Sequence, residues 1–288
     1  MPLILGAQSA VATGFSVDNS CRYNRPDNPD LSRTPGSDGN RQVYTISCWV
    51  KRASLSSYQP IFSTSGNNWA DFKNDDTLRV ACGNSVGNRT TNRLFRDISA
   101  WMHFVFKIDT TQGSAADRLR IYINGVEETS FSASVAVVQD FETDMNWTGA
   151  SFEVLHDGGG SRTLDGYAAE FVLLDGTAAA PTEFAEFNED SPSIWQPKDV
   201  SGLTFGTNGL YLNFSDSADL GADSSGNGND LTVANLTALD QTTDTPTNNF
   251  ATANPLMSNA EGYLEANLYV TDRASTDYSF GACSSMGA

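Results

Sequence analysis

The feature that most constrains the fold of this chain is a series of short segments whose side chains alternate between two faces. In residues 43–50 (VYTISCWV), Tyr44 and Ile46 fall on one face, and the residues between them fall on the other. Residues 101–108 and 119–123 repeat the pattern and are rich in β-branched and aromatic residues, which favour strands. Because apolar residues do not recur at helical spacing, these segments predict β-strands.

Turn-forming residues separate these segments from further predicted strands. The other strands are expected at 77–81, 152–155, 167–174 and 209–214. Clusters of Gly, Asn, Asp and Ser lie at 36–40, 65–68, 83–88, 157–161 and 205–209. Asn124-Gly125 directly follows one strand, and this dipeptide is the strongest two-residue hairpin signal. Many short strands with such punctuation predict an all-β, antiparallel two-sheet sandwich of the jelly-roll type.

Helical signals are few, and the composition changes towards the C-terminus. Residues 180–187 (APTEFAEF) predict one or two helical turns, with Thr182 as the N-cap. From about residue 237 the chain is polar and contains Pro246 and Pro255. We therefore expect a sandwich over residues 1–236 and an extended linker and arm over 237–288. A polar arm orders poorly alone, so we expect contact with a neighbouring subunit, with a homotrimer favoured.

The charge and the cysteines exclude several functions. The net charge is −18, with 17 basic and 35 acidic residues, which disfavours nucleic acid and anionic membrane surfaces as partners. The cysteines are Cys21, Cys48, Cys82 and Cys283, and they form no C-x-x-C pair. The chain has only two histidines, His103 and His156, so a structural zinc site is not expected. The first three cysteines are expected to be buried and free.

The sequence shows neither the features of a signal peptide nor those of a membrane span. The N-terminal residues MPLILGA have no basic region, and their apolar run is shorter than that of a signal peptide. No apolar stretch reaches the length of a membrane span. The expectation is synthesis in a cytoplasm without general secretion, which disfavours a secreted adhesion domain.

An ordered series of motifs resembles the laminin-G-like, concanavalin A-type domain of phage tail-fibre and other virion surface proteins. The first motif is YTISCWVKRASL at 44–55, and the second spans 97–128, with DISAWMHFVFKIDTTQ followed by DRLRIYINGVEE. The remaining motifs lie at 164–187, 194–202, 208–232 and 243–255, the last being TDTPTNNFATANP. The series covers most of residues 15–255.

The resemblance implies a structural role at a virion surface, as a tail fibre or as a decoration of the capsid or tail. It implies a concanavalin A-like fold, other virion proteins as partners and a lectin-like ability to hold a host surface glycan. A phage protein is made in the host cytoplasm and released by lysis, so it needs no export signal. The alternative from another class is a glycan-cleaving hydrolase, because sandwiches of this type include glycosidases.

Candidate catalytic residues are incomplete in the sequence. Retaining glycosidases need two carboxylates about 5 Å apart. In the glucanases that this chain resembles, both carboxylates lie on one strand, in a pattern like Glu-x-Asp-x-Glu. Here Asp140, Glu142 and Asp144 are followed by Asn146 where the second Glu would stand. The segment predicts a solvated acidic loop, and no enzymatic activity is expected. Neither histidine suggests catalysis: His103 lies in an apolar strand, and His156 in HDGGG predicts a solvated loop residue.

Two tryptophans are the best candidates for glycan binding. Trp69 in GNNWADF and Trp147 in DMNWTGA are flanked by amides and carboxylates, and both segments predict polar loops. An apolar plate beside hydrogen-bonding groups is what sugar recognition needs. The candidate glycan-binding residues are Trp69, Trp147, Asn67, Asn68, Asp71 and Asn146. We expect recognition on loops, because the strands are apolar on both faces; the alternative is that each Trp covers the sandwich edge.

No cofactor is expected, and calcium is the one candidate ion. The segment SDSADLGADSSGNGND supplies oxygen ligands densely, and calcium prefers such ligands. The candidate metal ligands are Asp216, Asp219, Asp223, Asn227 and Asp230. The alternative is a series of turns in which these side chains cap their own backbone.

Overall fold

The computed structural model describes residues 14–83, 87–158 and 162–250, together with two short strands at 263–264 and 269–270. The described residues form two large antiparallel sheets that pack face to face. The expected all-β sandwich is therefore confirmed.

Sheet A contains the two longest strands of the described residues. In spatial order it consists of β10 (Val126–Glu127), β9 (Leu119–Ile123), β8 (Met102–Asp109), β3 (Val43–Arg52), β13 (Gly166–Asp175), β1 (Ser20–Tyr23) and β18 (Gln241–Thr242), with β16 (Leu210–Leu212) also paired to β13. Asn124 and Gly125 join β9 to β10 with φ of 48° and 78°, so the expected Asn-Gly hairpin is confirmed.

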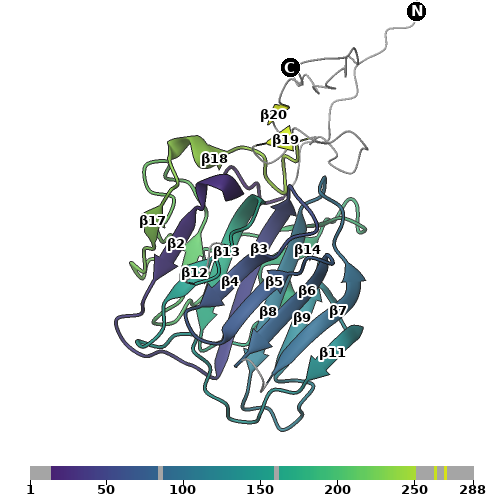
Figure 1. Cartoon of the computed structure of the whole chain (residues 1–288), viewed down its shortest axis with the longest axis vertical. Coiled ribbons are helices and arrows are strands. Elements are labelled where there is room, and N and C mark those ends of the chain that lie inside the picture. The colour runs from purple at the N-terminus through teal and green to yellow at the C-terminus, as the bar shows by residue number, and fades with distance from the viewer. Residues whose placement is uncertain (1–13, 84–86, 159–161, 251–262, 265–268, 271–288) are drawn as a thin grey trace, which may run out of the picture.

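Sheet B packs against sheet A and presents its other face outwards. In spatial order it consists of β11 (Phe131–Val135), β7 (Asn88–Leu94), β6 (Thr77–Cys82), β5 (Asn68–Phe72), β4 (Gln59–Thr64), β12 (Phe152–Val154), β2 (Asp30–Arg33) and β17 (Thr232–Ala234). The strands run diagonally in Figure 1, with β2 and β17 at one side and β11 at the other.

Short elements complete the described part of the chain. They are two hairpins, β14 (Ala185–Phe187) with β15 (Trp195–Pro197) and β19 (Tyr263–Leu264) with β20 (Tyr269–Val270), and the 3₁₀ turns η1 (Arg25–Asp27), η2 (Pro181–Glu183) and η3 (Ala238–Asp240). Among the described residues, no helix has the length and apolar character needed to cross a membrane.

The main core lies between the sheets and follows the alternation of the sequence. Tyr44 and Ile46 of β3 and Phe104 of β8 point into it from sheet A, and Phe62 and Phe72 point into it from sheet B. Each of these side chains is at most 1% exposed. Burying apolar surface between two sheets is the main stabilising contribution to such a fold.

The outer face of sheet A is covered as well. One apolar cluster holds Trp49, Trp101 and Tyr167, and Trp195 of the β14–β15 hairpin packs against it. A second cluster holds Val105, Val172, Leu174, Ala179, Phe184, Val200, Phe205 and Tyr211. This coverage explains why β3, β8 and β13 carry large apolar residues on both faces. A ligand-binding face of the sandwich is therefore to be sought on sheet B.

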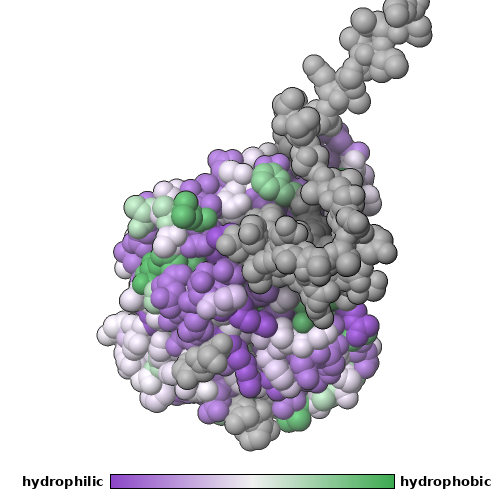
Figure 2. Space-filling view, turned by 45° about the horizontal axis from the view of Figure 1, so that its top comes forward, coloured by the Kyte–Doolittle hydropathy of each residue, from purple (hydrophilic) through white to green (hydrophobic). Residues whose placement is uncertain are grey.

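The net charge of −18 indicates a surface rich in acidic groups. Figure 2 shows one face on which hydrophilic residues predominate and hydrophobic ones form small groups. The exposed large hydrophobic residues among those described are Leu94, Val126, Val135, Val138, Phe187, Ile194, Leu239 and Phe250.

Two local expectations have clear outcomes. One helical turn is present within 180–187, as the 3₁₀ turn η2, but Thr182 is not its N-cap. The N-cap of η2 is Ala180, and residues from Ala185 onwards pair with β15 in place of a second turn. Hairpin pairing of Phe187 with Trp195 outweighs the weak helical preference. Cys21, Cys48 and Cys82 are buried and free, as expected; Cys283 lies outside the described residues.

The sandwich continues past the expected boundary at residue 236. Thr237 and Asp240 form a capping box that begins η3, and β18 then pairs with β1. Asp244 and Thr245 are at most 1% exposed. Residues 237–250 are thus part of the packed body, and most of the expected arm beyond them lies outside the described residues.

Candidate functional site

The open outer face of sheet B carries a row of polar and aromatic side chains. Ser32 of β2 is directly opposite Glu153 of β12, Glu153 is opposite Ser63 of β4, and Ser63 is opposite Trp69 of β5. Residues directly opposite each other in antiparallel strands point to the same face. Because Val154, the neighbour of Glu153, is in the core, this row faces away from it.

A second row beside it fixes the position of the Trp69 ring. Asp71 of β5 is opposite Arg79 of β6, and Arg79 donates from Nε to Oδ1 (3.0 Å) and from a terminal nitrogen to Oδ2 (2.7 Å). The Arg79 guanidinium lies 4.1 Å from the centroid of the Trp69 ring. Burial raises the pKa of Asp71, and the Arg79 hydrogen bonds act in the opposite direction. The pair holds a flat aromatic surface beside a neutralised carboxylate.

Ser63 and Trp69 of the first row, with Asp71 and Arg79 of the second, line a shallow depression with a volume of about 270 Å³. Its lining residues are Pro60, Ser63, Thr64, Ser65, Gly66, Trp69, Ala70, Asp71, Arg79, Asp157, Gly158 and Arg162. Ligand pockets for drug-sized molecules usually exceed roughly 300 Å³, so this depression suits a single sugar residue. An aromatic plate among hydroxyl, carboxylate and guanidinium groups matches the apolar face and hydroxyl edge of a sugar.

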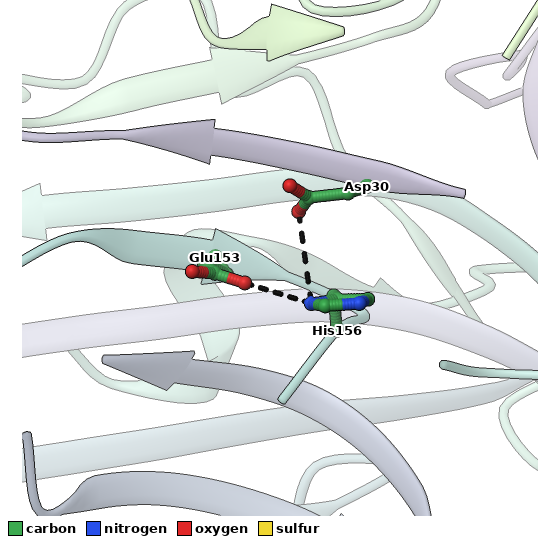
Figure 3. A group of neighbouring side chains, drawn as sticks. All are labelled: Asp30, Glu153 and His156. Atoms are coloured by element: carbon green, nitrogen blue, oxygen red, sulfur yellow. Dashed lines mark hydrogen bonds and ion pairs between the residues drawn. The ribbon is translucent and has the colours of Figure 1, made fainter. Parts of the chain in front are cut away.

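Asp30, Glu153 and His156 form a cluster of side chains (Figure 3). It adjoins the depression, because the N–H of Gly158, which lines the depression, donates to Glu153. His156 Nδ1 is 2.8 Å from Glu153 Oε2 and 3.9 Å from Asp30 Oδ1. The Ser63 hydroxyl, which lines the depression, donates to the carbonyl of His156 at 2.9 Å. Hydrogen bonding to Glu153 and the charge of Asp30 raise the pKa of His156 against its burial. Burial and repulsion by Glu153 raise the pKa of Asp30.

The structure overturns the expectation that His156 is solvated. Its side chain is only 7% exposed, because the chain after β12 stays in the sheet, where His156 forms a bridge with Thr163. In the sequence, the apolar alternation of FEVLHD ends at His156. The sequence pattern therefore did not predict that His156 would pair with Thr163.

Two of the six expected glycan-binding residues, Trp69 and Asp71, line the depression. The expectation that Trp69 lies in a loop is wrong, since Trp69 is the second residue of β5. The strand alternates: Ala70 and Phe72 enter the core, and Trp69 and Asp71 face outwards. The two asparagines before Trp69 hid this short alternation.

The other four residues do not line the depression. Asn67 is exposed and donates its N–H to Asp144, and Asn68 is buried and accepts from the N–H of Gly83. Asn146 is turned inwards and donates to the Asn40 carbonyl and to Asp175. Trp147 is half-buried, with the guanidinium of Arg41 4.8 Å from its ring centroid.

The expected metal ligands between 216 and 230 hold the turns of their own segment. Asp223 accepts from the N–H groups of Tyr211, Ser225 and Asn229, and Asp230 accepts from the N–H of Asp223. Asp216 and Asp219 each accept from the N–H two residues later. Asn227 donates to the carbonyls of Gly206 and Gly209. These contacts are those of the turn alternative, and calcium binding here stays a prediction.

His103 and the acidic loop lie where the sequence placed them. His103 Nδ1 accepts from Trp195 Nε1 at 3.0 Å, so Nε2 carries the proton and lies 2.8 Å from the Ser47 hydroxyl. Burial lowers the pKa of His103 to about 3. Residues 140–146 form an irregular segment in which Glu142 is exposed and pairs with Arg41.

The two packed antiparallel sheets define a concanavalin A-like β-sandwich. The profile of the concanavalin A-like lectin/glucanases superfamily matches residues 28–182, more than half of the chain. The chain belongs to that family, in its laminin-G-like branch.

A solved structure agrees with this fold. A candidate carbohydrate-binding protein of Bacteroides ovatus superposes with a TM-score of 0.53 and 17% identity, over 77% of this chain and 61% of that protein. A pentraxin of Limulus polyphemus (TM-score 0.40, 16% identity, 58% of this chain and 80% of that one) and the mouse laminin α1 LG4-5 domains (0.39, 13%, 62% and 50%) are more distant. No curated protein matches the sequence.

Proposed function

We propose that this chain is a non-catalytic glycan-binding domain and that the outer face of sheet B holds the sugar. The observation that carries this proposal is the fixed Trp69 ring at the floor of the depression, backed by Arg79 and flanked by Asp71. The similarity to a candidate carbohydrate-binding protein supports it at the level of the fold.

The depression favours neutral sugars over charged ones. Arg79 is already engaged by Asp71, and Arg162 lies 3.8 Å from Asp157. The cationic and anionic groups of the lining therefore compensate each other and offer paired donors and acceptors to hydroxyl groups. Stacking on one aromatic ring contributes on the order of 1 kcal/mol beyond buried area. A single site would bind weakly, and many copies would be needed for adhesion.

We also propose that the chain belongs to the surface of a bacteriophage particle, as a fibre or as a decoration of the capsid or tail. Support comes from the ordered motifs between residues 44 and 255. Copies on a particle would supply the avidity that a weak site needs. Purified virions should contain peptides of this chain. Particles from which the surface proteins have been removed should lack them.

A glycan array probed with multivalent protein tests the binding proposal. Wild-type protein should bind a set of neutral glycans, and Trp69→Ala should lose that binding. Trp147→Ala is the matched control, because Trp147 does not line the depression, and it should bind as wild type does. Equal binding by wild type and Trp69→Ala, or loss only in Trp147→Ala, would contradict the proposed site.

A further inference from the structure

We propose that Asp30, Glu153 and His156 form a binding site for a divalent transition metal, with zinc as its model ion. One nitrogen and two carboxylate oxygens from these residues lie within 4.8 Å of one another. They come from β2, from β12 and from the residues just after β12 (Figure 3). This site differs from the calcium candidate at 216–230, and it goes beyond glycan binding.

The first argument is the charge of the cluster. Two carboxylates face a single imidazole, so the cluster has a negative charge whichever form His156 takes. Both ion pairs that the described residues give to Asp30 and Glu153 go to His156; no described lysine or arginine neutralises either carboxylate. Charges in such a half-buried position are costly unless they are paired. A divalent cation would supply the missing charge.

The second argument is an unsatisfied atom inside the cluster. Asp30 Oδ1 is buried and has no hydrogen-bond partner, although it points at the His156 ring from 3.9 Å. Buried carboxylate oxygens nearly always have a donor. The imidazole is itself only 7% exposed. A metal ion among the three groups would bind this oxygen in place of a donor.

The ligand types and spacings select the metal. Imidazole nitrogen suits zinc and its neighbours, whereas calcium and magnesium prefer sites made of oxygen alone. Bonds of about 2.0 Å in a tetrahedral zinc site place ligand atoms about 3.3 Å apart. The observed 2.8 Å and 3.9 Å lie on either side of this value, and the third pair of ligand atoms, on Asp30 and Glu153, lies within 4.8 Å. The side chains would have to rotate to close round an ion.

Three protein ligands leave one position of a tetrahedral ion open. Glu153 is directly opposite Ser63, which lines the depression. An ion on Glu153 would thus lie at the edge of the proposed sugar site. A hydroxyl of a bound sugar or a water molecule would occupy the open position.

The test is a titration of the full-length, chelator-treated protein with zinc chloride, followed by side-chain NMR of the histidines. The chain has only His103 and His156, so the experiment carries its own control. His156 resonances should shift in a saturable way, and His103 should not respond, because Trp195 and Ser47 occupy its two nitrogens. Unchanged His156 resonances at millimolar zinc, or a response of His103 instead, would overturn the proposal.

Calorimetry on variants gives a second readout. Glu153→Gln and His156→Gln should lose affinity for zinc by about 100-fold or more, since even groups behind the ligands contribute about 10–100-fold. Glu186→Gln, the same change at an exposed position of β14, should bind as wild type does. Calcium chloride should not compete with zinc. Wild-type affinity for zinc in both Glu153→Gln and His156→Gln, or displacement of zinc by calcium, would refute the metal site. Failure of the protein to bind glycans would contradict the proposed function and leave the metal site standing.

Discussion

Lys51 and Asp244 are 193 residues apart in the chain and form a buried ion pair, with Nζ 2.8 Å from Oδ2. Lys51 also donates to the Asn249 side chain and to the carbonyl of Phe250, and Trp101 Nε1 donates to the other Asp244 oxygen. The pair therefore connects the first, second and last motifs of the resemblance. It fastens residues 241–250 to the outer side of sheet A.

Removing one partner of this pair should be strongly destabilising. Asp244→Asn and Lys51→Met each leave a charge buried without its counter-ion, which costs about 3–5 kcal/mol. Chemical denaturation should show this loss for both variants. Lys73→Met is the control, because the Lys73–Asp75 pair is partly exposed and such pairs contribute at most about 1 kcal/mol. Equal stability of Asp244→Asn and wild type would show that the pair is not the fastening.

The Asp71–Arg79 pair should act on sugar binding through Trp69. Arg79→Met leaves the Asp71 carboxylate, of which 9% is exposed, without its partner and frees the ring. We expect a loss of stability of about 1–3 kcal/mol and weaker glycan binding. The double variant Asp71→Asn, Arg79→Met should recover stability and not binding. Recovery of both in the double variant would mean that the pair serves only the fold.

Glu170 should make stability depend on pH. It is buried in β13 with φ of 50° and accepts from the Tyr211 hydroxyl, and burial raises its pKa from 4.5 to about 7. Between pH 4.5 and 7 the folded state therefore keeps a proton that the unfolded state releases. The contribution of Glu170 to the free energy of unfolding is full below pH 4.5 and is lost as the pH rises through 7.

The variant Glu170→Gln should remove this part of the pH dependence. Above pH 7 it should be more stable than wild type by about 1–3 kcal/mol, the upper value being the full pKa shift converted at about 1.4 kcal/mol per unit. Urea unfolding at pH 5 and pH 8 measures the difference. Glu186→Gln should be neutral at both. A Glu170→Gln variant as pH-dependent as wild type would show that another group titrates.

No hydrolysis of glycans is expected. Carboxylate oxygens of Asp30 and Glu153 lie within 4.8 Å of each other, near the separation of about 5 Å that a retaining pair needs, but His156 lies against both. Incubation with β-glucans and host polysaccharides should release no reducing ends. Release by wild type that Glu153→Gln abolishes would support the hydrolase alternative, and Glu142→Gln would then be the control.

Truncation should separate folding from assembly. A chain ending at residue 250 keeps the Lys51 partners, whereas a chain ending at 236 loses them and should be less stable by several kcal/mol. If residues beyond 250 make the proposed trimer, light scattering should give a trimer for the full chain and a monomer for the chain ending at 250. A trimer from the shorter chain would place assembly in the sandwich.

The sequence by itself determined the sheet content and much of the core. Alternation in β3, β8 and β9 identified the strands, and Asn124-Gly125 identified a hairpin, because these signals are local and depend on side-chain period and turn chemistry. The sequence also identified Trp69 and Asp71 as candidate sugar-binding residues, because an aromatic ring next to amides and carboxylates is typical of sugar recognition. Local signals could not tell that Trp69 lies in a strand, because β5 is short.

Only the tertiary structure decided which face of which sheet is open, and so where a ligand can bind. Sheet A is covered by a hairpin and loops from far along the chain, and no local pattern encodes that coverage. The meeting of Asp30 with Glu153 and His156, and of Lys51 with Asp244, is set by strand order and register. Those are fixed by the joint burial of both sheets, which is a property of the whole chain.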